Sequence, residues 1–249
     1  MTYGSFVEVY ELKDEFKREV LSTYYETILL KDCVANNQIR DIKSFKELSF
    51  YALTNLTSLY SYISLSKVLK INDKSVKDYI LFLENCYLFS ELKLFSYSLK
   101  EQINNKKKLY LSDNGFISLG YSFSSNYGKL LENLVFTELQ KADFEIFYFN
   151  SDFECDFIAK KANKIIAIQV CYSLTEENKK REINAFLKLP FNVDENYIIT
   201  YNQRDKIDDI EVISFWEYFQ GFNNNWNEDI KELSGSWGDF LSAKKIENI

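Results

Sequence analysis

Three runs between Gly128 and Cys171 decide the fold: GKLLENLVFTELQ (128–140), FECDFIAKK (153–161) and KIIAIQVC (164–171). In the first run, apolar residues recur at helical spacing, which predicts one amphipathic helix carrying Glu132. The other two runs are rich in β-forming residues and are separated by a short polar turn at 161–163, so they predict a hairpin. A further strand is predicted just before them, at 145–150.

Alternation along these strands predicts where the polar side chains point. Successive residues of a strand face opposite sides of a sheet, so Glu154 and Asp156 are expected on one face. The opposite face is expected to carry three apolar side chains: Phe153, Cys155 and Phe157. The turn sets a register that brings Asp156 close to Gln169, and Glu132 reaches both from the helix. Carboxylate and amide oxygens gathered at the end of a sheet suit a hard divalent cation such as Mg²⁺.

The order of these elements resembles the PD-(D/E)XK nuclease superfamily: a helix with Glu, a strand, a strand with Asp, a strand with (Glu/Gln)-x-Lys, a helix and a strand. More closely, GKLLENLVF, ECDF and IQVCYSL resemble the C-terminal region of a large group of prokaryotic AAA-type ATPases that carry a nuclease-like domain of unknown function. The resemblance implies that Glu132, Asp156 and Gln169 form the catalytic site and bind Mg²⁺ or Mn²⁺. It places Cys171 at the position of the catalytic lysine.

Cys171 departs from the superfamily pattern, because a thiol supplies no fixed ammonium group to orient the attacking water. Three nearby lysines are candidates for a relocated ammonium group: Lys160, Lys161 and Lys164. Two interpretations of the domain therefore stay open. It is either a degenerate or weak nuclease-like domain, or an active Mg²⁺- or Mn²⁺-dependent nuclease.

The composition excludes several classes of protein and site. The chain has 249 residues, of which 46% are hydrophobic, enough for the cores of two modest domains. It contains no histidine, which excludes a Ser-His-Asp triad and a His-ligated zinc. Its four cysteines lack metal-ligand spacing and are expected to be free thiols. No apolar run is long enough to span a membrane and no signal peptide pattern is present, so a cytoplasmic protein without membrane contact is expected.

Residues 44–125 are expected to form a winged-helix domain. The predicted elements are three helices and two strands joined by a polar loop: 45–60, 65–71, 73–86, 87–97, 107–112 and the loop 99–106. Asn72 is placed to cap the third helix. On that helix, Lys74, Ser75 and Lys77 are expected to be exposed near the N-terminus, where a recognition helix meets DNA.

The charge distribution agrees with a nucleic-acid partner for this segment. Between Tyr60 and Ser112 there are nine lysines and five acidic residues, a net charge of +4 in a chain whose net charge is −7. A basic segment in an acidic chain indicates contact with phosphate, because the local field rather than the total charge acts on a ligand. DNA and RNA both remain candidate partners, and homo-oligomerisation stays open.

Residues 1–43 are expected to be a helical linker. One helix is predicted from Glu11 to Val34, with its packed stripe at Leu12, Phe16, Val20, Leu21, Tyr24 and Ile28. The opening MTYGSFVEVY resembles the Gly-Gly-Phe-Pro-Glu-Val segment that ends the ATPase module of the family, and LYLSDNGF resembles its Asp-x-Gly signature. Asp113 and Gly115 of that signature are interpreted as a turn with a helix cap.

No nucleotide is expected to bind this chain, because it contains no G-x-x-x-x-G-K-[ST] loop. All of the resemblance lies C-terminal to the nucleotide site of the family. The chain is therefore interpreted as the back half of such an ATPase, with the missing N-terminal ATPase module as a partner.

The expected fold class is α+β or α/β, with a PD-(D/E)XK nuclease-like domain at residues 126–220. After the hairpin, a helix is predicted from Thr175 to Lys188, with Ile183, Phe186 and Leu187 packed on the sheet. The last predicted elements are two strands and a short helix: 196–201, 210–215 and 215–219. Residues 221–249 are a C-terminal extension, in which Trp226 and Trp237 would dock on this domain or on another subunit.

Three functions follow as alternatives. The preferred hypothesis is that the chain is the effector region of an AAA-type ATPase. It would bind nucleic acid through the basic segment between Tyr60 and Ser112 and through the groove that holds substrate in active nucleases of the superfamily. The second is an active metal-dependent nuclease that requires Asp156 and a relocated lysine. The third is a structural or protein-interaction module. Salt-dependent binding to nucleic acid separates the first from the third, because phosphate contacts weaken steeply as salt rises.

Overall fold

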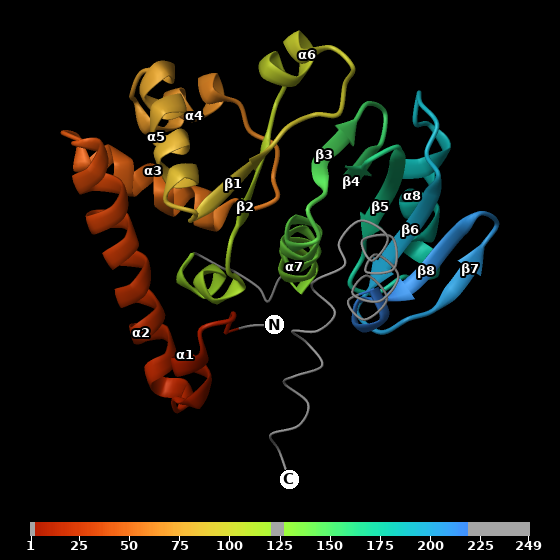
Figure 1. Ribbon diagram of the computed structural model, residues 1–249, viewed down its shortest axis with the longest axis horizontal. Coiled ribbons are helices and arrows are strands. Elements are labelled where there is room, and N and C mark those ends of the chain that lie inside the picture. The colour runs from red at the N-terminus through yellow and green to blue at the C-terminus, as the bar shows by residue number, and fades with distance from the viewer. Residues whose placement is uncertain (1–2, 121–126, 219–249) are drawn as a thin grey trace, which may run out of the picture.

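The computed structural model describes residues 3–120 and 127–218, and they form a mixed α+β fold, as predicted (Figure 1). In this part of the chain, one sheet has six strands in the order β3-β4-β5-β6-β8-β7, and a second sheet pairs β1 with β2. The N-terminal helices lie on one side of α7 and the six-stranded sheet on the other (Figure 1). The predicted extension at 221–249 lies outside the described residues.

The first predicted helix, 11–34, is three elements instead of one: α1 (Val7–Glu11), α2 (Asp14–Thr27) and the π-helix η1 (Ile28–Ala35). Its predicted packed stripe is wrong at Phe16, which is 48% exposed, while Leu21 and Tyr25 are buried. The later members of the stripe do pack as predicted, since Val20, Tyr24 and Ile28 contact the core of the N-terminal helices.

The predicted three helices and two strands follow, with shifted bounds: α3 (Ile42–Thr54), α4 (Tyr62–Leu69), α5 (Asp73–Asn85), β1 (Phe89–Leu92) and β2 (Lys108–Leu111). Asn72 caps α5 as predicted, accepting hydrogen bonds from the backbone N–H groups of Lys74 and Ser75. The predicted loop 99–106 is wrong, because Leu99–Asn104 is a helix, α6. Hydrogen bonds from Ser96 to Glu101 and from Gln102 to Ser96 hold its first turn.

Asp113 acts as the cap that the sequence predicts, at the start of the 3₁₀-helix η2 (Asn114–Leu119). Its Oδ1 accepts from Gly115 N at 2.7 Å, and its Oδ2 accepts from the N and Oγ of Ser5 at 2.7 and 2.5 Å. The N-terminal segment is therefore fixed to residues more than 100 positions away. Gly4 permits this approach with a left-handed φ of 74°.

The C-terminal part begins with α7 (Tyr127–Lys141) and continues through an antiparallel meander: β3 (Glu145–Asn150), β4 (Glu154–Lys161) and β5 (Lys164–Val170). A crossover through α8 (Glu176–Leu187) leads to β6 (Glu195–Thr200), which pairs parallel to β5. Strand β7 (Asp205–Ile207) was not predicted; it is a three-residue edge strand antiparallel to β8 (Ile210–Ser214).

Helices α7 and α8 cover opposite faces of the large sheet. One core joins Leu131, Val135 and Phe136 of α7 to the sheet, and another joins Ala185 and Phe186 of α8 to the sheet's other face. The predicted packing of Leu187 is wrong, since this side chain is 70% exposed. Glu182 of α8 is buried instead.

Strand β2 of the small sheet is fastened directly to α7. The buried Asn133 side chain accepts from Leu111 N at 2.8 Å and donates to Leu111 O at 2.9 Å. The ring of Tyr110 stacks on Phe136, with centroids 4.3 Å apart. Leu92 and Tyr110 of the small sheet thus belong to the same core as α7 and the large sheet, whereas the N-terminal helices pack around a core of their own.

Candidate functional site

Three carboxylates gather where β4 begins, and a lysine ammonium group lies among them. Lys108 Nζ is 3.2 Å from Glu132 Oε1, 2.6 Å from Glu154 Oε1 and 3.3 Å from Asp156 Oδ1. The three acids come from α7 and β4, whereas Lys108 is the first residue of β2. The predicted proximity of Glu132 and Asp156 is confirmed by their shared contact with this ammonium group.

An irregularity in β4 sets the direction of these acids. Residues Phe147 and Phe149 of β3 pair with Ile158 and Cys155, so β4 carries one extra residue at this point. Consequently Phe157 belongs to the core on the α7 side, while Cys155 belongs to the core on the α8 side. The expectation that both point the same way is therefore wrong, because it rests on unbroken alternation.

The charged groups of this cluster shift one another's pKa values. Burial lowers the pKa of Lys108, but the surrounding acidic groups of Tyr110, Glu132, Asp156 and Glu154 outweigh it and hold that pKa well above its usual value. Burial raises the pKa of Asp156 to about 7, with Glu132 acting in the same direction and Lys108 against it. The Tyr110 hydroxyl also donates to Glu132 Oε1 at 2.8 Å.

Gln169 lies next to Asp156, as predicted, but its side chain does not join the carboxylates. Its Oε1 accepts from the backbone N–H of Asp156 at 3.1 Å, and its Nε2 donates to Glu182 Oε2 at 2.8 Å. The Asp156 carboxylate instead accepts from the backbone N–H of Val170 at 3.0 Å. Gln169 therefore connects β4 to α8, on the other side of the sheet from Glu132.

Cys171 occupies a buried position that suits a thiol and not an ammonium group. Its Sγ donates to Ser173 O at 3.0 Å and accepts from Asn178 Nδ2 at 3.3 Å. Burial raises its pKa, so the neutral thiol persists at neutral pH.

The three lysines proposed as substitutes for the family's lysine are engaged elsewhere. Lys160 pairs with Glu145 at 3.6 Å, Lys161 donates to Ala142 O at 2.8 Å, and Lys164 pairs with Glu195 at 2.6 Å. The lysine that reaches the acids is Lys108. The sequence offered one signal for it, a charged residue at the start of an otherwise apolar strand, KLYL.

A divalent cation does not fit this arrangement. The ammonium group of Lys108 stands at the point where the three carboxylates converge, at hydrogen-bonding distance from each. Within residues 3–120 and 127–218, no group of three or more Asp, Glu, Cys or His side chains is arranged to hold a metal ion. The predicted site at Glu132, Asp156 and Gln169 also lacks its third member. We therefore derive no metal-dependent step.

The acids open onto a cleft of ≈ 750 Å³ that runs from α7 to α8. Lys129 and Arg181 also line it, together with Asp152, Phe153 and the loop residues Thr57 to Leu59. Arg181 donates to Glu182 through Nε at 3.0 Å. The cleft thus carries both signs of charge and keeps its polar groups largely paired with one another.

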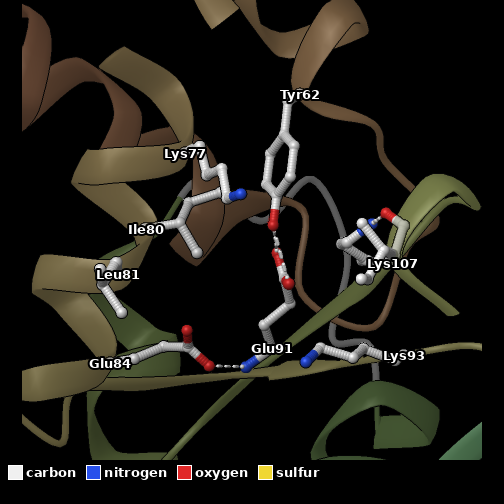
Figure 2. Close-up of a pocket in the computed structure, with 9 residues that line it drawn as sticks. Tyr62, Lys77, Ile80, Leu81, Glu84, Glu91, Lys93 and Lys107 are labelled. Atoms are coloured by element: carbon white, nitrogen blue, oxygen red, sulfur yellow. Dashed lines mark hydrogen bonds between the residues drawn. The ribbon is translucent and has the colours of Figure 1, made fainter. Parts of the chain in front are cut away.

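A second cleft, of ≈ 290 Å³, lies between α5 and β1 and is lined by three lysines, Lys77, Lys93 and Lys107 (Figure 2). The ammonium groups of Lys77 and Lys93 lie on opposite sides of a Tyr62–Glu91 pair in Figure 2. Tyr62 donates to Glu91 at 2.8 Å, and Glu84 accepts from the backbone N–H of Glu91 at 2.9 Å. Both acids are thus bound within the cleft.

Lys107 lies at the inner side of this second cleft and adds positive charge. Its Nζ donates to Ile103 O and Asn105 O, both at 2.7 Å. Burial lowers its pKa, Glu91 raises it, and Lys93 and Lys77 lower it. Lys93 and Lys77 thus act on Lys107 as like charges.

The three residues predicted to contact nucleic acid differ in their exposure to solvent. Lys74 and Lys77 are exposed on α5, as expected, while Ser75 is half-buried. Lys77 lines the second cleft. Lys93, which follows β1 directly, was not among the residues predicted to meet nucleic acid.

Comparison with known proteins divides the chain into two matched segments. Residues 1–124 match a family model described as a domain of unknown function (DUF8612), and residues 127–218 match a second domain of unknown function (DUF4143). Lys108 belongs to the first matched segment and its three carboxylate partners to the second, so the cluster joins them.

Two curated relatives are similar to most of the chain. An uncharacterised protein, MJ1544, from Methanocaldococcus jannaschii is 34% identical over 239 residues, covering 87% of this chain and 53% of the relative. An uncharacterised protein from Haemophilus influenzae is 28% identical over 224 residues, covering 85% of this chain and 54% of the relative. The chain spans about half the length of the curated relatives it matches. None of the described helices is long and apolar enough to cross a membrane.

Proposed function

We propose that this chain is the nucleic-acid-associated effector region of a longer AAA-type ATPase, and that its nuclease-like domain does not cleave its ligand. One observation carries the association with nucleic acid. Lys77 and Lys93 border the second cleft, and within the described residues neither forms an ion pair. Ammonium groups that lie outside ion-pair distance of an acid attract phosphate, and their desolvation cost is small because they are exposed.

The order of the N-terminal elements supports this assignment of the binding surface. Three helices followed by an antiparallel strand pair is the order of a winged helix, and α5 stands in the place of its recognition helix. The exposed Lys74 extends the same surface along α5. The phosphate backbone of a strand lying over the second cleft would meet α5 on one side and Lys93 on the other.

The absence of cleavage rests on the two departures at the acidic site. Cys171 supplies no ammonium group, and Lys108 lies among the carboxylates where a metal-dependent nuclease would need a cation. The association with an ATPase rests on the resemblance of the motifs and on the relatives, which are about twice as long as the matched chain.

The test measures binding and cleavage on the same samples of the full chain. Labelled single-stranded DNA, duplex DNA and single-stranded RNA are titrated by fluorescence anisotropy between 50 and 200 mM salt, in Mg²⁺ and in Mn²⁺. We expect binding that weakens as salt rises and intact nucleic acid at the end of each titration. If none of the three nucleic acids binds, the proposed function is wrong and the hypothesis of a protein-interaction module is favoured. If nucleic acid is cleaved and Asp156→Ala abolishes the cleavage, the domain is an active nuclease.

A matched pair of variants locates the binding surface. Lys77→Ala/Lys93→Ala removes two unpaired ammonium groups, and the slope of log K against log salt should fall by roughly 1.4 to 1.8. The control, Lys160→Ala/Lys188→Ala, removes the same charge from exposed ion pairs of the C-terminal part and should leave the slope near that of the unchanged protein. Equal slopes in the two double variants would contradict the assignment of the surface.

A further inference from the structure

We propose that Lys108 is a built-in cation that fills the acidic site, fastens the two matched segments of the chain together and excludes divalent metal ions. The proposal rests on the proposed function in one respect, since it gives the reason why the nuclease-like domain does not cleave. Three observations lead to it: the position of the ammonium group, the rigidity of the strand that delivers it, and the charge balance of the cluster.

The ammonium group is placed as a bound cation would be. It contacts one oxygen of each of Glu132, Glu154 and Asp156, at 2.6 to 3.3 Å. The side chain of Lys108 is 1% exposed, so solvent does not compete for these contacts. An ammonium group has three N–H donors, and here each of the three has a carboxylate within reach.

The strand that carries Lys108 is held at several points. Asn133 bonds both the N–H and the C=O of Leu111 at the other end of β2, and Tyr110 donates to Glu132 from the middle of the strand. Before β2, Lys107 exchanges two backbone hydrogen bonds of 2.9 Å with Tyr60. These bonds fix the backbone position from which the Lys108 side chain reaches the acids.

The charge balance explains why a metal ion does not displace the lysine. An ammonium group attached to the chain faces the carboxylates at an effective concentration far above that of a free ion. A divalent ion would have to bind while a buried ammonium group remained beside it without its acidic partners, which is costly. Removing the lysine alone should leave three carboxylates with oxygen ligands that suit Mn²⁺.

The experiment compares Mn²⁺ binding by the full chain and by Lys108→Met, which keeps the length of the side chain and removes its charge. Electron paramagnetic resonance of Mn²⁺ reports the free ion at each concentration. At 100 µM Mn²⁺, we expect the unchanged chain to bind no Mn²⁺ and Lys108→Met to bind one ion. The double variant Lys108→Met/Asp156→Asn should again bind none. A matched variant, Lys160→Met, should behave as the unchanged chain does.

Two results would overturn the proposal. One is Mn²⁺ binding by the unchanged chain that Asp156→Asn abolishes, which would show that the lysine does not exclude the ion. The other is a folded Lys108→Met variant that binds no Mn²⁺. These outcomes differ from failure of the proposed function, which is decided by anisotropy and cleavage measured on the unchanged chain.

If Lys108→Met does not fold, a second test compares the melting temperatures of two other variants. Asp156→Asn and Lys108→Met/Asp156→Asn are compared, because the double variant removes one charge of each sign. If Lys108 neutralises the acids, the double variant should fold where Lys108→Met does not. A double variant that is unfolded while Asp156→Asn is folded and fully stable would contradict the role of Lys108 as the counter-ion of Asp156.

Discussion

Among single residues, Asp156 is the one whose protonation should be visible in the stability of the whole protein. Burial raises its pKa from 3.8 to about 7, and Glu132 adds to the shift. A carboxyl group with a raised pKa binds a proton more tightly in the folded state than in the unfolded state. Its contribution to the free energy of unfolding is therefore fully present below about pH 4 and is lost as pH rises to about 7.

We expect Asp156→Asn to remove this component of the pH dependence. Between pH 4 and pH 7, the fall in unfolding free energy that Asp156 causes should be on the order of a few kcal/mol, and the variant should show a flatter profile. Urea denaturation at several pH values measures it. Asp152→Asn, an exposed acid lining the same cleft, is the control, and an unchanged slope in Asp156→Asn would contradict the pKa shift.

A second prediction concerns Gly4, which lets the N-terminal segment reach Asp113. It has a φ of 74°, and a Cβ added there would lie 1.7 Å from Asp113 Oδ1. Gly4→Ala should lower the free energy of unfolding by about 1–3 kcal/mol, because the left-handed backbone and the overlap both cost energy. Thermal unfolding checks this. Gly120→Ala is the comparison without left-handed backbone, since its φ is negative and its added Cβ would lie 3.1 Å from Leu53 O, so its loss should be the smaller one. A change below about 0.5 kcal/mol in Gly4→Ala would count against it.

At the scale of elements, the cap of α5 should decide how firmly the lysine-bearing helix is held. Asn72 accepts from Lys74 N at 2.8 Å and from Ser75 N at 3.2 Å. Replacing it with Ala leaves both N–H groups without the side-chain acceptor, so we expect a loss of about 1 kcal/mol of stability. Asn85→Ala, at the exposed C-terminal end of the same helix, should have a smaller effect.

Amide hydrogen exchange provides the readout that separates a local from a general effect. In Asn72→Ala, faster exchange should be confined to the first turns of α5, while the large sheet stays protected. Binding to nucleic acid should weaken together with this fraying, since Lys74 and Lys77 lie in those turns. Unchanged exchange in α5 would show that the cap is not needed.

Most elements could be predicted from local patterns, and the errors fall where the local pattern carries no signal. The hairpin of β4 and β5 and the cap of α5 could be predicted because turn and cap residues are adjacent in sequence. The extra residue in β4 could not, since a bulge is fixed by pairing with β3 and leaves no mark in the alternation. The short helix α6 was missed because its polar residues resemble those of a loop.

The same reasoning explains what could be predicted of the acidic site. Glu132 and Asp156 were found because their own elements point them to the same place, and resemblance to a nuclease superfamily selected the same residues. Lys108 was not found, because its partner Asp156 is 48 positions away on an element of the other matched segment. Only packing of β2 against α7 brings them together. The roles of Gln169 and Cys171 depend on contacts with α8 and its preceding loop, which no local pattern specifies.

At the scale of the whole molecule, the two matched segments should behave as one folding unit. Tyr110 and Leu92 from the first segment belong to the core of the second, and Asn133 of the second is completely buried against the backbone of the first. Backbone bonds add to this, since Phe95 N donates to Tyr148 O at 2.7 Å and Tyr148 N donates to Lys93 O at 3.0 Å. Such a contact resembles the interior of one domain more than a surface between two.

Cutting the chain between the segments should therefore not separate them. With a protease recognition sequence placed within residues 121–126, both fragments should elute together from a size-exclusion column after cleavage, and unfold in one transition. Adding Asn133→Ala to this cut protein removes the acceptor for Leu111 N and the donor to Leu111 O, leaving buried backbone groups unpaired, at a cost of about 1–3 kcal/mol each. The fragments should then separate at concentrations where the unchanged pair stays together. If the unchanged fragments separate as soon as they are cut, the lysine and the asparagine are contacts between independent domains, and Lys108 is then free to leave the acids with its own segment.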